Sequence, residues 1–194
     1  MSDIYNIQSP FIGDKVKLRA LEVSDLDNIM RYFNNYETRV GLGNIIPISY
    51  KMEEDWINSA IERAKAGTAY IFVIEHKENG ELLGTCGIED ISTISRSATL
   101  GIGIHNPENF NKGYGTDAMI CLMKFGFRVL NLHRIELWTF DYNQRAIHVY
   151  KKLGWKEVGK RREVMFLQGK YHDAIVMDLL QNEFEDIYKE EIVS

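Results

Sequence analysis

Alternating polar and apolar residues predict the first strand of the chain. The stretch KVKLRAL, residues 15–21, alternates in this way, which is the period of a half-buried β-strand. Three further strands are predicted to form a meander, over residues 69–76, 81–91 and 97–105. The Asn79-Gly80 pair between the first two of these favours a tight hairpin turn, because both residue types tolerate positive φ.

Helical spacing of apolar residues predicts two helices ahead of this meander. Ser24 is predicted to cap the first helix, whose apolar side comprises Leu26, Ile29, Met30 and Phe33. Ser49 is predicted to cap the second, and Gly67 to end it. The connection over residues 34–49 is predicted to be irregular, because two glycines and a proline interrupt any periodicity.

A third helix is predicted after the meander. Its apolar stripe comprises Ala118, Leu122, Phe125 and Val129, with Cys121 beside it. A strand over residues 133–140 follows, and then a short helix over 143–154 that Gly154 closes. The segments WKEVGKRREVMFL and YHDAIVMDLL predict a final long hairpin about residues 168–170.

The resulting order is β-α-α-β-β-β-α-β-α-β-β, which predicts an α+β fold. We expect a mixed, mostly antiparallel sheet of about seven strands flanked by helices. A strand reached through a helical crossover is expected to pair in parallel. No repeat or linker divides the chain, so residues 1–194 are predicted to form a single domain with its core at about 15–181.

Composition and charge exclude several classes of function. The net charge of −5 argues against a nucleic-acid binder, which would present a dense basic face. No apolar run approaches the ~20 residues of a membrane span, and no secretory leader is recognisable. The five histidines and two cysteines show no metal-ligand spacing, so no metal is predicted. We therefore expect a cytoplasmic protein with reduced thiols.

The stretch Lys112-Gly113-Tyr114-Gly115 lies between a predicted strand and a predicted helix. It lacks the Walker pattern, and it fails the Rossmann pattern because Ala118 occupies the third glycine position. Glycines allow the backbone to close on an anion, and the first amides of a helix are unpaired at its positive end. The residues alone leave two readings open, a phosphate-binding loop and a flexible helix entry.

Two longer segments, taken together, resemble the GNAT superfamily of N-acetyltransferases. Residues 110–115, FNKGYG, are similar to its pyrophosphate loop [QR]-x-x-G-x-[GA], although Phe110 replaces the usual Gln or Arg. Residues 143–155, NQRAIHVYKKLGW, are similar to its segment N-x-x-A-x-x-x-Y-x-x-x-G-[FW]. The Gly-x-Tyr-x-Asp of residues 169–173 adds a third match. The branch containing ribosomal-protein and spermidine/spermine acetyltransferases is the most similar.

The resemblance implies acetyl-CoA as the co-substrate. Its pyrophosphate would lie on the backbone of seven residues, namely Phe110, Asn111, Lys112, Gly113, Tyr114, Gly115 and Thr116. Its pantetheine would extend along Gly101, Ile102 and Gly103, where glycines in a strand also suggest a close backbone approach. Asn143 would contact the pantetheine as well as cap a helix, and Arg145 would reach a phosphate.

The same resemblance implies that Tyr150 protonates the leaving thiolate. The alternative role of this residue is core packing, because it lies on the apolar stripe of its helix. The general base stays open among Glu89, Asp90, His105, Glu136 and a water relay, since Thr99 stands where some relatives carry a glutamate. A backbone N–H near Ile102 could stabilise the oxyanion.

The implied function is direct transfer of an acetyl group from acetyl-CoA to a primary amine. The acceptor would be a polyamine such as spermidine or spermine, a protein N-terminal amine, or another small amine. The acidic residues Glu37, Glu53, Glu54 and Asp55 could attract a polycation, but a solvated helix face explains three of them equally well. The alternative function is a catalytically idle acyl-CoA-binding regulatory module. A homodimer is expected only from the habit of the family.

Overall fold

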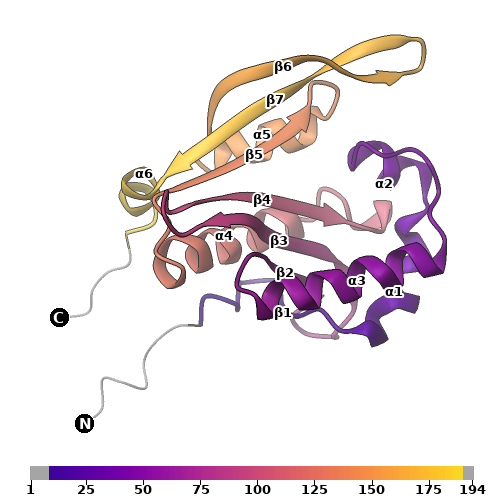
Figure 1. The fold of residues 1–194 in the computed structure, drawn as a ribbon, viewed down its shortest axis with the longest axis horizontal. Helices are drawn as coiled ribbons and strands as arrows, with labels where there is room; N and C mark the ends of the chain where they lie inside the picture. Colours follow the sequence, from indigo (N-terminus) through magenta and orange to yellow (C-terminus); the bar gives the residue numbers. More distant parts are fainter. Residues whose placement is uncertain (1–8, 190–194) are drawn as a thin grey trace.

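The computed structural model describes residues 9–189, and a seven-stranded sheet forms its centre (Figure 1). The predicted domain limits of 1 and 194 lie outside the described residues. The strands lie in the order β1-β2-β3-β4-β5-β7-β6. Their bounds are β1 Val16–Ala20, β2 Tyr70–His76, β3 Leu82–Ser92, β4 Ser97–Ile104, β5 Arg134–Phe140, β6 Lys156–Leu167 and β7 Lys170–Leu180. Every predicted strand is therefore confirmed to within about two residues at each end.

The β4–β5 pair is parallel, whereas the other neighbouring strands pair antiparallel. This confirms the parallel pairing expected after a helical crossover. The parallel contact is short, because only Ser97–Thr99 pair with Arg134–Glu136. Beyond Thr99 the two strands diverge, as Figure 1 shows. The residues of β4 from Leu100 to Ile104 consequently pair with β3 alone.

Six α-helices flank the sheet in the described part of the chain. They are α1 Leu26–Phe33, α2 Tyr36–Gly41, α3 Tyr50–Lys65, α4 Tyr114–Lys124, α5 Gln144–Lys152 and α6 Gln181–Ile187. Four of these were predicted. The other two, α2 and α6, are short, and only one or two residues of each are buried, so neither has a long apolar stripe to mark it in the sequence.

Apolar residues on both faces of the sheet are covered by helices. Ile71 and Val73 of β2 pack in one cluster with α1 and α3. Phe72 and Ile74 lie on the opposite face of the same strand, and Ile74 packs with α4 in the larger cluster. This division follows from the alternation of side chains across a strand. The sheet is thus the middle layer of three.

Ser24 does not cap the first helix, in contrast to the prediction. It lies inside a 3-10 turn, Val23–Asp25, that precedes α1. The carboxylate of Asp25 instead accepts a hydrogen bond from the Glu22 N–H at 3.0 Å, and it pairs with Arg19 at 2.7 Å. The ionised Asp25 carboxylate, held by the Arg19 guanidinium, is a stronger hydrogen-bond acceptor at this turn than the Ser24 hydroxyl.

The connection at 34–49 contains the helix α2, so the prediction of an irregular segment is wrong for its first half. The Asn35 side chain caps α2 by accepting a hydrogen bond from the Glu37 N–H at 2.9 Å. Gly43 follows the end of this helix with a φ of +75°. The glycines that break the sequence pattern therefore end a short helix rather than preclude one.

Val129 departs from the apolar stripe predicted for the third helix. The α-helix ends at Lys124, and a π-helical turn, Phe125–Val129, continues it. The Leu130 N–H bonds the Phe125 carbonyl at 3.0 Å, which is the wider i to i+5 spacing of a π-turn. Ala118, Leu122 and Phe125 are buried as predicted, whereas Val129 is 56% exposed because the wider turn rotates it outward.

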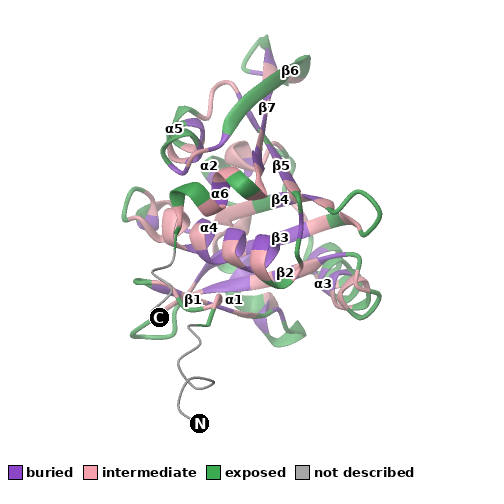
Figure 2. Cartoon of the chain, turned by 90° about the vertical axis from the view of Figure 1, so that its left-hand side faces the viewer, coloured by how far each residue is buried: buried purple, intermediate pink, exposed green. Residues whose placement is uncertain are grey.

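The predicted final hairpin is confirmed and projects beyond the helices that cover the sheet (Figure 1). Its turn contains Gln168 and Gly169, both with positive φ. The outer strand β6 is exposed along nearly its whole length (Figure 2). Two register shifts, between Glu157 and Gly159 and between Arg161 and Met165, interrupt its pairing with β7.

Candidate functional site

A hollow of about 840 Å³, open to solvent, occupies the place where β4 and β5 diverge. We call it cavity 1. It is lined by the end of β4, the loop ahead of α4, the inner side of α5, and α2. All the predicted site residues line it except Gly101 and Lys112. Residues predicted from separate motifs therefore line one cavity, together with residues of α2 that no motif indicated.

The glycine-containing loop presents the positive end of α4 to cavity 1. Gly113 precedes the helix with a φ of +86°, a conformation that other residues adopt only with strain. The first amides of α4 have no partner within the helix. Asp117 secures this end of α4, because its carboxylate accepts backbone N–H bonds from Asp14, Lys15 and Val16 at 2.7–3.1 Å. The loop therefore has the backbone geometry that an anion site at a helix N-terminus requires.

Gly115 leaves room in cavity 1 that a side chain would fill. A Cβ built at this position would come no closer than 3.7 Å to its nearest neighbour, a side-chain carbon of Ile104. Its φ is not positive, so the fold itself does not require glycine there. This makes close approach of a ligand the better account of the residue.

Lys112 does not line cavity 1 and turns toward its own loop. Its Nζ donates to Asn109 Oδ1 at 3.3 Å. Its carbonyl accepts a hydrogen bond from Lys15 Nζ at 2.8 Å. Lys15 thus contributes a second cation near Gly113, 3.3 Å from where a Cβ would stand. No sequence pattern indicated Lys15, because it reaches the loop from the residue before β1 through tertiary structure alone.

Phe110, the departure from the family pattern, holds Arg145 at the rim of cavity 1. The guanidinium carbon of Arg145 lies 3.7 Å from the centroid of the Phe110 ring. A cation over an aromatic face is attracted by the ring quadrupole. Desolvation lowers the pKa of Arg145, although it remains charged at neutral pH. Sequence reasoning had treated the two residues separately.

The two glycines of β4 serve different needs. A Cβ at Gly103 would lie 2.9 Å from the Leu42 side chain, which follows α2. Gly103 therefore permits close packing of that segment against the strand. A Cβ at Gly101 would meet nothing within 4 Å, and Gly101 faces a second hollow rather than cavity 1.

Helix α5 brings Asn143 and Tyr150 to the same cavity. The Asn143 side chain accepts a hydrogen bond from the Ala146 N–H at 3.2 Å, which confirms the predicted cap. Tyr150 is 8% exposed, and burial raises its pKa to about 12. No hydrogen bond joins its hydroxyl to another residue of 9–189. Tyr150 is therefore a neutral proton donor at physiological pH whose hydroxyl is free for a ligand.

None of the four candidate bases lines cavity 1. Glu89 forms an ion pair with Arg63, and Glu136 is held by Arg134 at 2.5 Å. Asp90 is exposed at a residue with a φ of +52°. His105 is 1% exposed, with Nε2 lying 3.2 Å from the Thr85 hydroxyl and Nδ1 enclosed without a partner.

The enclosure of His105 predicts a loss of stability in mild acid. Burial lowers its pKa from 6.5 to about 4, so between these values the unfolded chain binds a proton that the folded protein does not. The stabilisation is complete above pH 6.5 and is lost as the pH falls toward 4. It amounts to roughly 3 kcal/mol. His105→Gln should reduce the drop in unfolding free energy between pH 7 and pH 4 by about that much, as measured by urea denaturation. Equal drops in both proteins would contradict this.

A second hollow of about 1200 Å³, cavity 2, adjoins the first. Leu42, Ile102 and Gly103 line both, so the two cavities lie next to each other at this part of β4. Helix α3 and strand β3 form most of the remaining wall, with Glu53 and Glu89 among the lining residues.

The acidic residues considered for polycation binding separate in the structure. Glu53 is 3% exposed, so a solvated helix face does not explain it. Glu54 and Asp55 lie toward solvent and pair with Lys51 at 3.0 and 2.8 Å. Glu37 is exposed at the edge of cavity 1.

Two further properties of residues 9–189 bear on the site. No three or more His, Cys, Asp or Glu residues gather there in a way that could hold a metal ion. None of the helices in this range combines the length and the apolar content needed to cross a membrane.

Comparisons with known proteins agree with the geometry. Residues 15–156 match the family described as the acetyltransferase (GNAT) domain. Spermidine N(1)-acetyltransferase of Escherichia coli K12 is 34% identical over 180 residues, covering 87% of this chain and 88% of its own. The Vibrio cholerae enzyme of the same name is 32% identical, with coverage of 89% and 97%. The crystal structure of spermidine N-acetyltransferase from V. cholerae with CoA and spermine has a TM-score of 0.78 at 30% identity, covering 88% and 98%.

Proposed function

Because the chain belongs to the GNAT acetyltransferase family, we propose that it transfers the acetyl group of acetyl-CoA directly to a primary amine of a polyamine. The observation that carries the proposal is that cavities 1 and 2 share Ile102 and Gly103 as lining residues, where β4 has no second strand partner. A donor in one cavity and an acceptor in the other would reach each other there. The relatives that act on spermidine support the choice of acceptor.

The residues around cavity 1 fit acetyl-CoA, which supplies an activated acetyl thioester. The unpaired edge of β4 offers backbone hydrogen bonds to an extended pantetheine, along Ile102 and Gly103 with Gly101 beside them. The amides of residues 110–116, at the positive end of α4, suit the pyrophosphate. Arg145, which lies over Phe110, would contact a phosphate, and Asn143 would contact the pantetheine. Lys112 does not line cavity 1, so it would add positive charge near the pyrophosphate without contacting it directly.

Tyr150 would act as the general acid of the transfer. Its raised pKa keeps the phenol protonated, and the hydroxyl can donate to the sulfur as the thiolate leaves. The backbone N–H near Ile102 would donate to the oxyanion of the tetrahedral intermediate. The proton of the acceptor amine would leave through water, because Glu89, the one of the four candidate bases that lines cavity 2, is already paired with Arg63.

The two cysteines support direct transfer without an acetyl-enzyme. Cys86 and Cys121 are both buried. Burial raises the pKa of the Cys86 thiol well above its ordinary value, and it raises the pKa of Cys121 to about 12. A thiol is a weak nucleophile when it cannot form the thiolate. Neither residue is therefore suited to carry the acetyl group.

Three further expectations accompany this proposal. A protein N-terminal amine as acceptor, a homodimer and a cytoplasmic location all stay predictions. The idle acyl-CoA-binding module is disfavoured by Tyr150, whose hydroxyl has no structural partner among residues 9–189 and faces cavity 1.

Release of CoA thiol across a panel of amines tests the proposal. Spermidine and spermine should be acetylated at least about tenfold more efficiently, in kcat/KM, than a peptide with a free N-terminus. Mass spectrometry of the product should show one added acetyl group on the amine and none on the protein. If acetyl-CoA binds but no amine in the panel is acetylated, the protein is a binding module and the proposal fails.

A further inference from the structure

We propose that Glu53 binds a second ammonium group of the acceptor in cavity 2, and thereby selects amines that carry two separated positive charges. The inference rests on the proposed function, because it concerns the acceptor of the same reaction. It differs in naming a residue of α3 that belongs to none of the motifs.

Glu53 is an unusual carboxylate because it is buried without a partner. It is 3% exposed and lines cavity 2. No residue within 9–189 hydrogen-bonds its side chain or forms an ion pair with it within 4 Å. A buried charge without a hydrogen-bonding partner is costly. Natural proteins retain such groups chiefly at functional sites.

The oxygens of Glu53 remain open to the cavity. Three other side-chain atoms among the described residues are enclosed without any partner, including Arg39 Nε and His105 Nδ1. The Glu53 oxygens are not enclosed in this way. A ligand in cavity 2 can therefore reach them and supply the missing hydrogen bonds.

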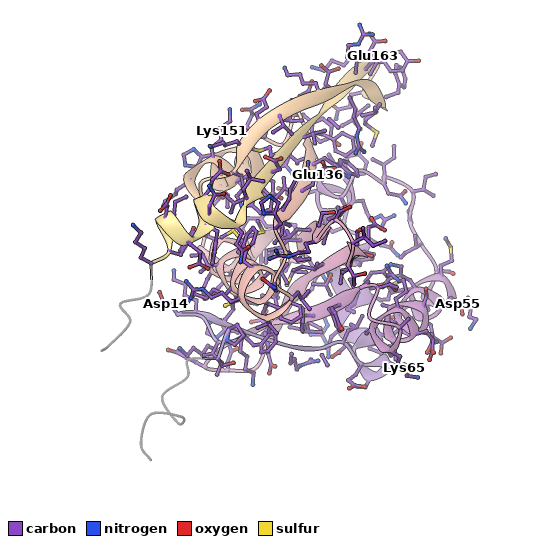
Figure 3. All side chains as sticks on the ribbon, turned by 60° about the vertical axis from the view of Figure 1, so that its left-hand side comes forward. Asp14, Asp55, Lys65, Glu136, Lys151 and Glu163 are labelled. Atoms are coloured by element: carbon purple, nitrogen blue, oxygen red, sulfur yellow. The ribbon has the colours of Figure 1, made fainter. Side chains whose placement is uncertain are left out.

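Neighbouring carboxylates contrast with Glu53. Glu89, which also lines cavity 2, is already paired with Arg63. Glu54 and Asp55 share Lys51, and Figure 3 shows Asp55 pointing away from the sheet on the outer side of α3. Glu53 is thus the carboxylate of this helix that is left for a cation inside the cavity.

Arg39 favours the ionised form of Glu53 but forms no ion pair with it within 4 Å. It is also 3% exposed and lines cavity 2. Its Nη2 donates to the Ile46 carbonyl at 2.9 Å, and its guanidinium lies over the Phe33 ring at 5.2 Å. Burial raises the pKa of Glu53, while the charge of Arg39 opposes that rise. Arg39 therefore favours the ionised form, although its own hydrogen bond is made elsewhere.

The walls between Glu53 and the β4 edge suit a methylene chain. Phe33, Ile48, Met52, Trp56 and Ile71 line cavity 2. Apolar walls ending in a carboxylate match a linear amine whose charges are separated by methylenes. One amine would react at Ile102 and Gly103, while the ammonium at the other end binds Glu53.

The selectivity between a diamine and a monoamine measures this role. We would compare kcat/KM for 1,4-diaminobutane and n-butylamine, which share a chain length and differ in the second ammonium. The wild-type protein should prefer the diamine by at least about tenfold, as expected for one charge-assisted hydrogen bond. Glu53→Gln should bring the ratio close to one and leave the KM for acetyl-CoA within about twofold. A merely structural role would lower both amines equally.

Glu54→Gln is the matched control, because it removes a carboxylate from the next residue of the same helix. It should keep the wild-type ratio. If Glu53→Gln does not unfold cooperatively, Glu53→Asp, which keeps the charge but shortens the side chain, should lower the ratio in its place. An unchanged ratio in the folded Glu53 variant overturns the inference while leaving the proposed function intact.

Calorimetry with spermidine, in the presence of CoA, separates failure of the inference from failure of the proposed function. If neither amine is acetylated by the wild-type protein, binding of spermidine that Glu53→Gln weakens at least about tenfold would still support the cation site. Binding that is absent, or equal in the two proteins, would overturn it.

Discussion

Tyr150→Phe should lower kcat for acetyl transfer by about 10²–10⁴-fold, which is the contribution expected of a general acid. The variant removes the phenol hydroxyl that α5 places in cavity 1. The affinity for acetyl-CoA should change by less than about threefold, since the ring and its packing remain. Thiol release under saturating substrate measures the rate, and calorimetry measures the affinity.

Stability provides the control for this variant. The Tyr150 hydroxyl bonds no residue in the described range, so its loss should shift the unfolding free energy by less than about 1 kcal/mol. Tyr188→Phe removes a phenol bonded to the Leu153 carbonyl at 3.4 Å, outside both cavities, and should leave kcat unchanged. If Tyr150→Phe retains the wild-type kcat, Tyr150 is a packing residue and another group protonates the thiolate.

The pH profile offers a further check on the same residue. A pKa of about 12 keeps Tyr150 protonated throughout the range in which the protein can be assayed. The rate should therefore show no alkaline decline attributable to this group below about pH 11.

Gly115→Val should weaken acetyl-CoA binding by about tenfold or more, while leaving the fold nearly as stable as before. The position lies in the first turn of α4 with a normal φ, and a Cβ there meets no atom closer than 3.7 Å. Valine has a slightly better helix propensity than glycine, so the helix itself is not weakened. The branched side chain would instead occupy the space beside the free amides that an anion needs.

Gly159→Val is the matched control for this substitution. A Cβ at Gly159 meets nothing within 4 Å, and β6 lies away from both cavities. Gly113→Val would be a poorer test, since valine at a φ of +86° strains the backbone whether or not a ligand binds. An unchanged affinity for acetyl-CoA in Gly115→Val would show that the glycine pair is a flexible helix entry and not a phosphate-binding loop.

Most of the fold could be predicted from local patterns along the chain. Every strand, the helices with a long apolar stripe, and caps such as Ser49 and Asn143 were predicted, because each depends on neighbours within a few residues. The helix α2 was missed because the signals for breaking a pattern and for ending a short helix are the same glycines. Val129 was misplaced because a π-turn changes the helical period, which the apolar spacing did not reveal.

The candidate site, like the fold, was predictable only where it depends on residues that are close in sequence. The candidate residues of the two motifs, within 110–116 and 143–150, could be predicted from sequence because each motif is contiguous, and all of them except Lys112 line cavity 1. Lys15 beside Gly113 and Leu42 against Gly103 could not be predicted, since each arrives from a distant element. The same holds for the placement of Arg145 over Phe110, which only the approach of α5 to the loop creates.

The sequence by itself determined the order of the strands and of the four longer helices, the glycine loop ahead of a helix and the tyrosine on α5, because local propensity and contiguous motifs act over short range. Only the tertiary structure decided where β4 and β5 part, and which of several similar carboxylates lies inside a cavity. Glu53, Glu54 and Asp55 are adjacent acidic residues, and no motif in the sequence marks one of them as part of a site. Burial against the sheet separates the first from the other two, because a helix directs successive residues to different sides.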